Sequence, residues 1–206
     1  MVSDFLSTSI EQFQSDCMQL CEQHYPTVHN RGMRENHLGK ALCRRILHTL
    51  SDANIQATIT QCQNEDKLSQ PVFHIQTSTF SVWVIAHRLL SANLARRQAL
   101  INAIKETKER LSGDHPHHLV LVADHWFDRS KASKEIPAWW LGQLPRNAVD
   151  YLSDGIRLQA VEIGLPEQLA ALSLTEGHHA LHHPLRRDNH QKTVYKYILL
   201  TSHYVL

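Results

Sequence analysis

The chain has 206 residues, 42% of them hydrophobic and 20% charged, which is an ordinary composition for a folded protein with a substantial core. Its formal net charge of +1 excludes a global basic field that would attract nucleic acid, so any basic surface must be local. No apolar run approaches the roughly 20 residues of a membrane span, and the first residues lack the basic and apolar regions of a secretory signal. We therefore expect a cytoplasmic protein with no membrane partner.

The first 90 residues predict two helices and three strands. Apolar residues recur at three- and four-residue steps over residues 3–24 and 34–51, which is the pattern of amphipathic helices. Three short stretches rich in apolar and β-branched residues then predict strands over residues 55–62, 71–76 and 80–88. Only polar links separate these strands, so we expect an antiparallel meander.

The clearest architectural signal begins at the third of these strands. Residues 80–88 are apolar on both faces, which indicates a strand in the middle of a sheet covered by helices. A helical pattern over residues 91–111 and an apolar strand over residues 118–123 follow. Strand, helix and strand at this spacing form a βαβ unit with parallel neighbours. The predicted fold class is therefore α/β, with a central mixed sheet flanked by helices.

Beyond residue 123 the pattern is less regular. In chain order we expect a polar loop, a short helix, a strand, a second short helix, a histidine-rich loop and a last strand (residues 124–134, 147–153, 156–163, 166–174, 176–183 and 193–200). No repeat or low-complexity linker divides the chain, which predicts a single α/β domain over residues 1–206. Within it we distinguish an N-terminal helical extension (1–30), a core (31–130) and a C-terminal extension (131–206).

The order of helix, three meandering strands, crossover helix and strand over residues 34–124 resembles the core of the restriction-endonuclease-like, or PD-(D/E)xK, nuclease superfamily. In that family a helix glutamate, an aspartate on the second strand and Glu-x-Lys on the third form the active site. The carboxylates hold a divalent metal, usually magnesium, which polarises the scissile phosphate. The resemblance places Glu35 at the helix position, Gln76 near the aspartate position, and Ala86-His-Arg88 at the Glu-x-Lys position. The implied site keeps one of three carboxylates, so metal-dependent cleavage should be lost.

The resemblance implies a catalytically silent nuclease-fold subunit of a prokaryotic cell, without a cofactor. It would bind DNA or RNA, or scaffold the protein subunits of a larger nucleic-acid-processing or antiviral defence complex. The basic residues expected to contact the phosphate backbone are Arg88, Arg96, Arg97, Lys131 and Lys134. The alternative for those on the crossover helix is that they form a solvent-exposed helix face without a binding role, with nearby glutamates balancing their charge.

Two further functions remain open from the sequence. The first is a metal-dependent nuclease or hydrolase with a rearranged site, which would use Glu35, Asp124 and His125. Asp124 and His125 follow a buried strand at its carboxyl end, where ligands usually bind. The metal ion would be magnesium or manganese. A protein-binding module without a nucleic-acid role would use Trp139 and Trp140. Adjacent residues cannot share a face of a helix or strand, so one of these tryptophans could be buried while the other reaches the surface for a partner. The alternative is that the pair packs the C-terminal half onto the core.

Sixteen histidines is an unusually high number, and four of them form the pattern His178-His179-x-x-His182-His183. On a helix, residues four apart share a face, so His178 with His182, or His179 with His183, could bind one transition metal. Gly177 and a proline bracket a stretch that is too short for a confident helix. A polar surface loop without a metal is therefore the expected arrangement.

Overall fold

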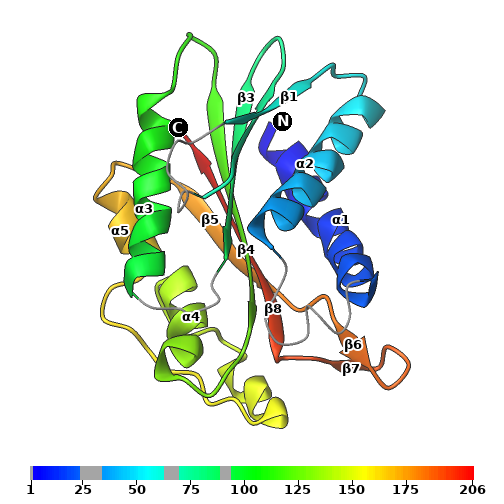
Figure 1. Ribbon diagram of the computed structural model, residues 1–206, viewed down its shortest axis with the longest axis vertical. Coiled ribbons are helices and arrows are strands. Elements are labelled where there is room, and N and C mark those ends of the chain that lie inside the picture. The colour runs from blue at the N-terminus through cyan, green and yellow to red at the C-terminus, as the bar shows by residue number, and fades with distance from the viewer. Residues whose placement is uncertain (1, 24–33, 63–69, 89–93) are drawn as a thin grey trace.

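One mixed sheet organises the chain in the computed structural model, which describes residues 2–23, 34–62, 70–88 and 94–206. The sheet has six strands in the order β1-β2-β3-β4-β8-β5 (Figure 1). Their bounds are Thr58–Cys62 (β1), Val72–Gln76 (β2), Ser81–Arg88 (β3), His117–Trp126 (β4), Gly177–His182 (β5) and Tyr197–Val205 (β8). Two very short strands, β6 (Arg186–Arg187) and β7 (Lys192–Thr193), form a separate ribbon.

The strand pairings follow the expected meander and crossover. β1 pairs with β2 and β2 with β3, both antiparallel, and β3 pairs parallel to β4. The connection between the parallel strands contains α3 (Leu94–Glu109). β8 then lies antiparallel between β4 and β5, which no sequence pattern predicted. The α/β class with a mixed sheet flanked by helices is confirmed.

Helices cover both faces of the sheet (Figure 1). One face, here the α1/α2 face, carries α1 (Val2–Gln23) and α2 (Glu35–Asp52). The opposite face, the α3/α4 face, carries α3, α4 (Lys131–Leu141) and α5 (Leu165–Ala170), and a 3-10 helix, η2 (Ala148–Asp154), lies at its lower end. Each face has its own apolar cluster, because successive strand side chains point to opposite sides.

Three segments of the C-terminal part differ from the prediction. Residues 156–163 do not form a strand; the segment lies beside α4, where the Gln159 amide donates to the Lys134 carbonyl at 3.0 Å. The alternation of apolar and polar residues in this segment arises because one of its sides packs against the protein, not because it pairs in a sheet. The histidine-rich segment is strand β5, and the segment with two tryptophans is helix α4 despite Pro137 within it.

No helix in the described parts of the chain combines the length and the apolar character that crossing a membrane requires.

Candidate functional site

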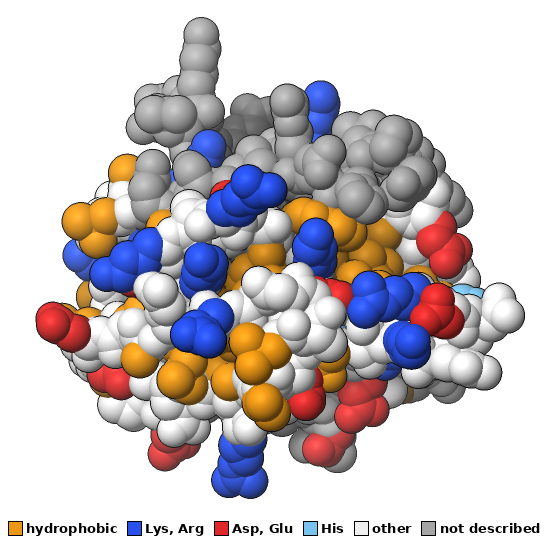
Figure 2. Space-filling view, turned by 90° about the horizontal axis from the view of Figure 1, so that it is seen from below, with side chains coloured by type: hydrophobic (Ala, Val, Ile, Leu, Met, Phe, Trp, Pro, Cys, Tyr) orange, Lys and Arg blue, Asp and Glu red, His pale blue; other side chains and the backbone are white. Residues whose placement is uncertain are grey.

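The candidate site is the end of the sheet at which the parallel strands β3 and β4 finish, because ligands of α/β sheets usually bind there. The register pairs Arg88 with Asp124, so both strands reach this end together. It lies at the bottom of Figure 1 and faces the viewer in Figure 2. Alternation then places Ala86 and Asp124 on the α1/α2 face, and His87 and His125 on the α3/α4 face.

Helix packing covers Ala86, the β3 residue that the resemblance places at a metal-ligand position. Ala86 is fully buried, and a Cβ built on Gly39 of α2 would lie 2.8 Å from the Ala86 Cβ. The helix backbone therefore rests directly on the strand at this point. Glu35 is half-buried at the start of α2, and the Asn36 side chain beside it accepts a hydrogen bond from Gln61 at 3.3 Å. α2 thus begins near this end of the sheet.

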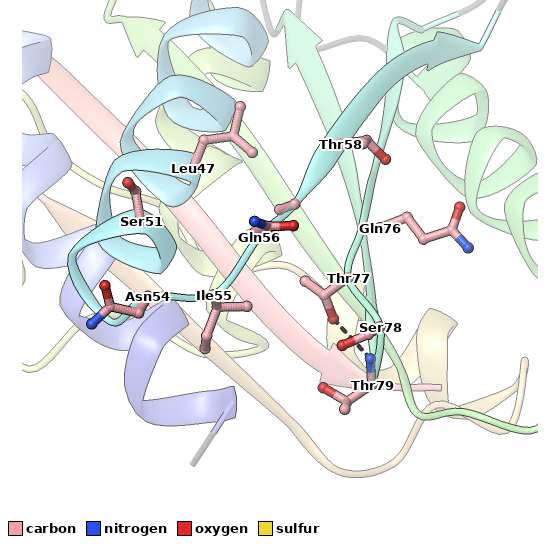
Figure 3. Close-up of a pocket in the computed structure, with 11 residues that line it drawn as sticks. Leu47, Ser51, Asn54, Ile55, Gln56, Thr58, Gln76, Thr77, Ser78 and Thr79 are labelled. Carbon is pink, nitrogen blue, oxygen red and sulfur yellow. Dashed lines mark hydrogen bonds between the residues drawn. The ribbon is translucent and has the colours of Figure 1, made fainter.

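Gln76 is not near Ala86, so its assignment to the aspartate position is wrong. It pairs with Ser81 at the other end of β3, whereas the Ala86 amide donates to the Pro71 carbonyl at 3.2 Å. Five residues of strand span roughly 16 Å. Gln76 instead lines an open groove of about 1300 Å³ between α2 and the β2–β3 turn (Figure 3). None of the described residues that line this groove is charged, so it lacks both a cation to hold a phosphate and a carboxylate to hold a metal ion.

Asp124 is held in a buried hydrogen-bonded chain. Its side chain is 2% exposed and accepts from the Tyr197 hydroxyl at 3.0 Å, and that hydroxyl lies 3.3 Å from the Cys17 sulfur on α1. Burial and the Asp124 charge raise the pKa of Tyr197, so the phenol stays protonated as a donor. A hydrogen bond with Cys21 and burial raise the pKa of the Cys17 thiol, which excludes a reactive thiolate at neutral pH.

His125 lies on the other side of the sheet from Asp124. It is 3% exposed, and its Nε2 atom is 2.6 Å from the Ser133 hydroxyl of α4. The same hydroxyl accepts from the Asp128 amide at 3.1 Å, which closes the loop between β4 and α4. Asp124 and His125 are therefore not an acid–base pair, and the set of Glu35, Asp124 and His125 does not converge. Adjacent residues on a strand point to opposite faces, which is the physical reason.

Arg97 is a structural residue rather than a phosphate ligand. Its side chain is 13% exposed, lies 3.3 Å from the Glu135 carboxylate and stacks over Trp139 at 5.2 Å. It thereby joins α3 to α4, which contradicts its expected role. Lys131 also reaches Glu135, at 3.6 Å, but remains 78% exposed.

The other basic residues expected to bind phosphate are less well placed or less defined. Lys134 and Arg96 are half-buried, and the positive charge of Arg96 acts on His87. The side chain of Arg88 lies outside what the structure describes. The described side chains of these residues therefore do not form one continuous basic surface along the crossover helix α3.

Both tryptophans of α4 are core residues. Trp139 is 1% exposed and donates to the Gln168 side chain of α5 at 3.2 Å, and Trp140 is 0% exposed and donates to the Thr201 carbonyl of β8 at 3.0 Å. They fasten α4 between α5 and the sheet. The expectation that one of them contacts a partner protein is wrong, because the helix tilts both rings into the apolar cluster.

The histidine-rich segment is neither a loop nor a helix, so its predicted metal pairs do not form. On β5, His178 and His182 lie on one face and His179 on the other, and residues four apart on a strand are roughly 13 Å apart. His183 follows the end of the strand. Most of these rings bind within the fold: His179 to Ser202 and Tyr204, His182 to Thr201, and His183 to Tyr151. Nowhere in the described residues do three acidic, cysteine or histidine side chains meet as a metal site.

One polar side chain at the candidate site is buried without a hydrogen bond. His87 is 0% exposed, and neither ring nitrogen has a hydrogen-bond partner in the described part of the chain. Burial lowers the pKa of His87 to about 3, and the charge of Arg96 adds to this, so the ring is neutral at pH 7. Gln70, two residues before β2, likewise has a buried side-chain oxygen without a partner among described residues.

We expect His87→Leu to raise the stability of the protein. The substitution removes a buried polar ring that gains no hydrogen bond, which should stabilise by about 1–2 kcal/mol and raise the Tm by about 2–8 °C. Thermal unfolding checks this. His118→Leu is the matched control, because His118 Nδ1 lies 3.0 Å from His203 Nε2, and losing that bond should lower the Tm. A lower Tm for His87→Leu would show that the ring has a partner.

Sequence reasoning missed a group of residues around Trp126, at the end of β4. Trp126, Arg186, Arg187 and Lys196 line one cavity together with the end of α1. These residues are up to 70 positions apart in the sequence, and only the placement of β8 beside β4 brings them together. The adjacent arginines were the one visible signal.

Comparisons with known proteins leave the chain without an assigned family. No family model matches it, and no curated protein matches it. Among solved structures, truncated Caenorhabditis elegans TDP2 has a TM-score of 0.36 at 8% identity and covers 79% of this chain and 81% of its own. Two further C. elegans TDP2 structures have a TM-score of 0.28 at 8% identity, with 61% and 62% of their chains covered. Likeness at this level supports no argument about fold family or function.

Proposed function

We propose that the protein is a nuclease-fold subunit that binds the phosphate backbone of DNA or RNA without cleaving it. In this proposal it works within a larger nucleic-acid-processing or defence assembly. The observation that carries it is the gathering of Lys and Arg side chains across the end of the sheet where β3 and β4 finish (Figure 2). Clustered cations on one surface bind phosphates irrespective of base sequence.

Three acidic side chains at this end are already engaged within the fold. Asp124 is buried against Tyr197, and Glu135 is shared by Arg97 and Lys131. Asp154 is bound by Arg187 at 2.9 Å and accepts from two backbone amides. These three carboxylates therefore oppose an incoming phosphate little, whereas Asp128 and Asp150 at the same end are exposed.

Lys131 and Lys196 belong to this basic surface. The Phe127 amide donates to the Lys196 carbonyl at 2.8 Å, so Lys196 lies directly beside the end of β4, and Lys131 begins the helix that follows. Both side chains are exposed. The order of elements along the chain supports the nuclease-fold part of the proposal, because α2, the β1–β3 meander, α3 and β4 occur in the same order as in the core of the nuclease superfamily. Ala86, packed under Gly39, supports the absence of cleavage.

The test is binding of a labelled duplex and a labelled single strand at about 50 mM and about 200 mM salt with magnesium present. We expect binding that salt weakens, and Lys131→Ala/Lys196→Ala should lower the salt slope by about 1–2. Lys40→Ala/Lys105→Ala removes the same charge from the outer surfaces of α2 and α3 and should leave binding unchanged.

Products of the same reactions, run on a denaturing gel, separate the proposal from its rival. Intact nucleic acid is the expected result. Magnesium-dependent cleavage that Glu35→Ala abolishes would instead establish a rearranged active site. If neither strand form binds, the nucleic-acid role is wrong, and the chain would then have to act on proteins alone.

A further inference from the structure

A cavity of about 780 Å³ opens beside the end of β4, between the end of α1 and the β6–β7 ribbon. Its volume lies within the range of about 300–1,000 Å³ that is usual for small-molecule sites. It is separate from the groove at Gln76, which lies at the opposite end of the sheet. We call it the Trp126 cavity.

One wall of the Trp126 cavity is apolar and aromatic. Met18 of α1, Leu185 and Val194 line it together with Trp126. The Trp126 ring is half-buried and packs against Tyr197, with the ring centroids 5.8 Å apart. Tyr197 is itself fixed by Asp124, so the indole stands on a rigid support. Flat heteroaromatic rings stack well on such a surface.

The rim of the cavity is positively charged. Arg186, Arg187 and Lys196 reach it, and Glu22 and Asp154 are the acidic residues among its lining. Asp154 is 3% exposed in its side chain and is saturated by Arg187 and by the amides of residues 195 and 196. Glu22 is therefore the one lining carboxylate left to oppose a bound anion at Lys196 and Arg186, and Arg186 also donates to the backbone carbonyls of His183 and Leu185. An apolar aromatic wall with a cationic rim complements a ligand that is both aromatic and anionic.

We propose that the Trp126 cavity receives one unpaired nucleotide of a bound nucleic acid. Its base lies against Trp126, and its phosphate lies between Lys196 and Arg186. The inference rests on the proposed function and adds a preference to it. A paired base shows only its edges, whereas an unpaired base can offer its face to an aromatic ring. The protein should therefore favour single strands, or duplexes with an unpaired end, over blunt duplexes.

Tryptophan fluorescence reports this contact directly. The protein has four tryptophans, and Trp83, Trp139 and Trp140 are no more than 6% exposed. A base stacked on Trp126 should therefore quench part of the emission when oligothymidine is added. The quench should vanish in Trp126→Phe, which lacks that fluorophore but keeps an aromatic wall.

The contribution of the Trp126 ring to the binding free energy is tested by measuring affinity from the fluorescence anisotropy of a labelled oligothymidine. Trp126→Leu should weaken single-strand binding about ten-fold and hardly affect a blunt duplex. Glu22→Gln should strengthen single-strand binding, because it removes the carboxylate that opposes the phosphate. Lys40→Ala/Lys105→Ala again serves as the variant that should change nothing.

The outcomes distinguish this inference from the function on which it rests. Equal binding of single strand and blunt duplex without any quench would overturn the cavity assignment and leave the basic surface as the whole site. An equal loss of affinity for single strand and blunt duplex in Trp126→Leu would also overturn the cavity assignment. The ring would then support binding only by stabilising the fold. No binding of either form would overturn both proposals.

Discussion

Ala86→Glu is expected to destabilise the protein by about 3–5 kcal/mol, rather than to rebuild a metal site. The substitution restores the carboxylate that nucleases of the resembled family carry at this position. Here the Ala86 side chain is 0% exposed and Gly39 packs on it, so a glutamate would either bury a charge or push α2 from the sheet. For a chain of this length the Tm should fall by about 6–20 °C.

Thermal unfolding with and without millimolar magnesium measures this effect. Gln76→Glu is the matched control: it makes the same carboxylate on an exposed strand position and should change the Tm little. A variant as stable as the parent would contradict the packing argument. So would a Tm that magnesium raises, because the new carboxylate would then share a metal ion with other ligands.

The protein should lose much of its stability between pH 6.5 and pH 5. Burial lowers the pKa of His179, His182, His183 and His203 to about 4, so these rings are neutral in the fold and take up protons on unfolding. A folded pKa below the unfolded value means that stability is complete above pH 6.5 and declines as the pH falls toward 4. One such ring accounts for roughly 2 kcal/mol by pH 5, which is large beside a total of about 5–15 kcal/mol.

Unfolding in urea at pH 7.5, 6 and 5 would measure this loss. His183→Gln should flatten the pH dependence by about one proton while keeping a hydrogen-bond partner for Tyr151. His48→Gln is the control, because the His48 side chain is 64% exposed on α2. Stability that is constant down to pH 5 would show that the histidine rings are charged or solvated in the fold.

The central part of the fold could be predicted because its signal is local and strong. β3 and β4 are apolar on both faces, so their place in the middle of a covered sheet followed from the residues alone. α4 escaped prediction because Pro137 and two adjacent tryptophans argue against a helix, whereas tertiary burial of both rings overrides that preference. β5 escaped because its histidines look like surface residues, although β8 gives their rings hydrogen-bond partners.

The site depended on contacts between distant residues, which no local pattern encodes. The sequence pattern predicts Arg97 to be an exposed cation, because its partner Glu135 lies 38 residues further along the chain. The sequence suggests an acid–base pair of Asp124 and His125 because the two residues are adjacent. It does not show that their side chains lie on opposite faces of a strand. The cavity at Trp126 could not be predicted for the same reason, since its walls come from five separate segments.

The position of β8 has a consequence for how the chain folds. β8 is the only described strand that pairs with both β4 and β5, which are themselves separated by about 50 residues. Until it docks, one edge of β4 is unpaired and β5 has no place in the sheet. Contacts between such distant segments form slowly. Folding of the whole sheet should therefore wait on this one late strand, and the nascent chain should be most prone to aggregation before β8 emerges.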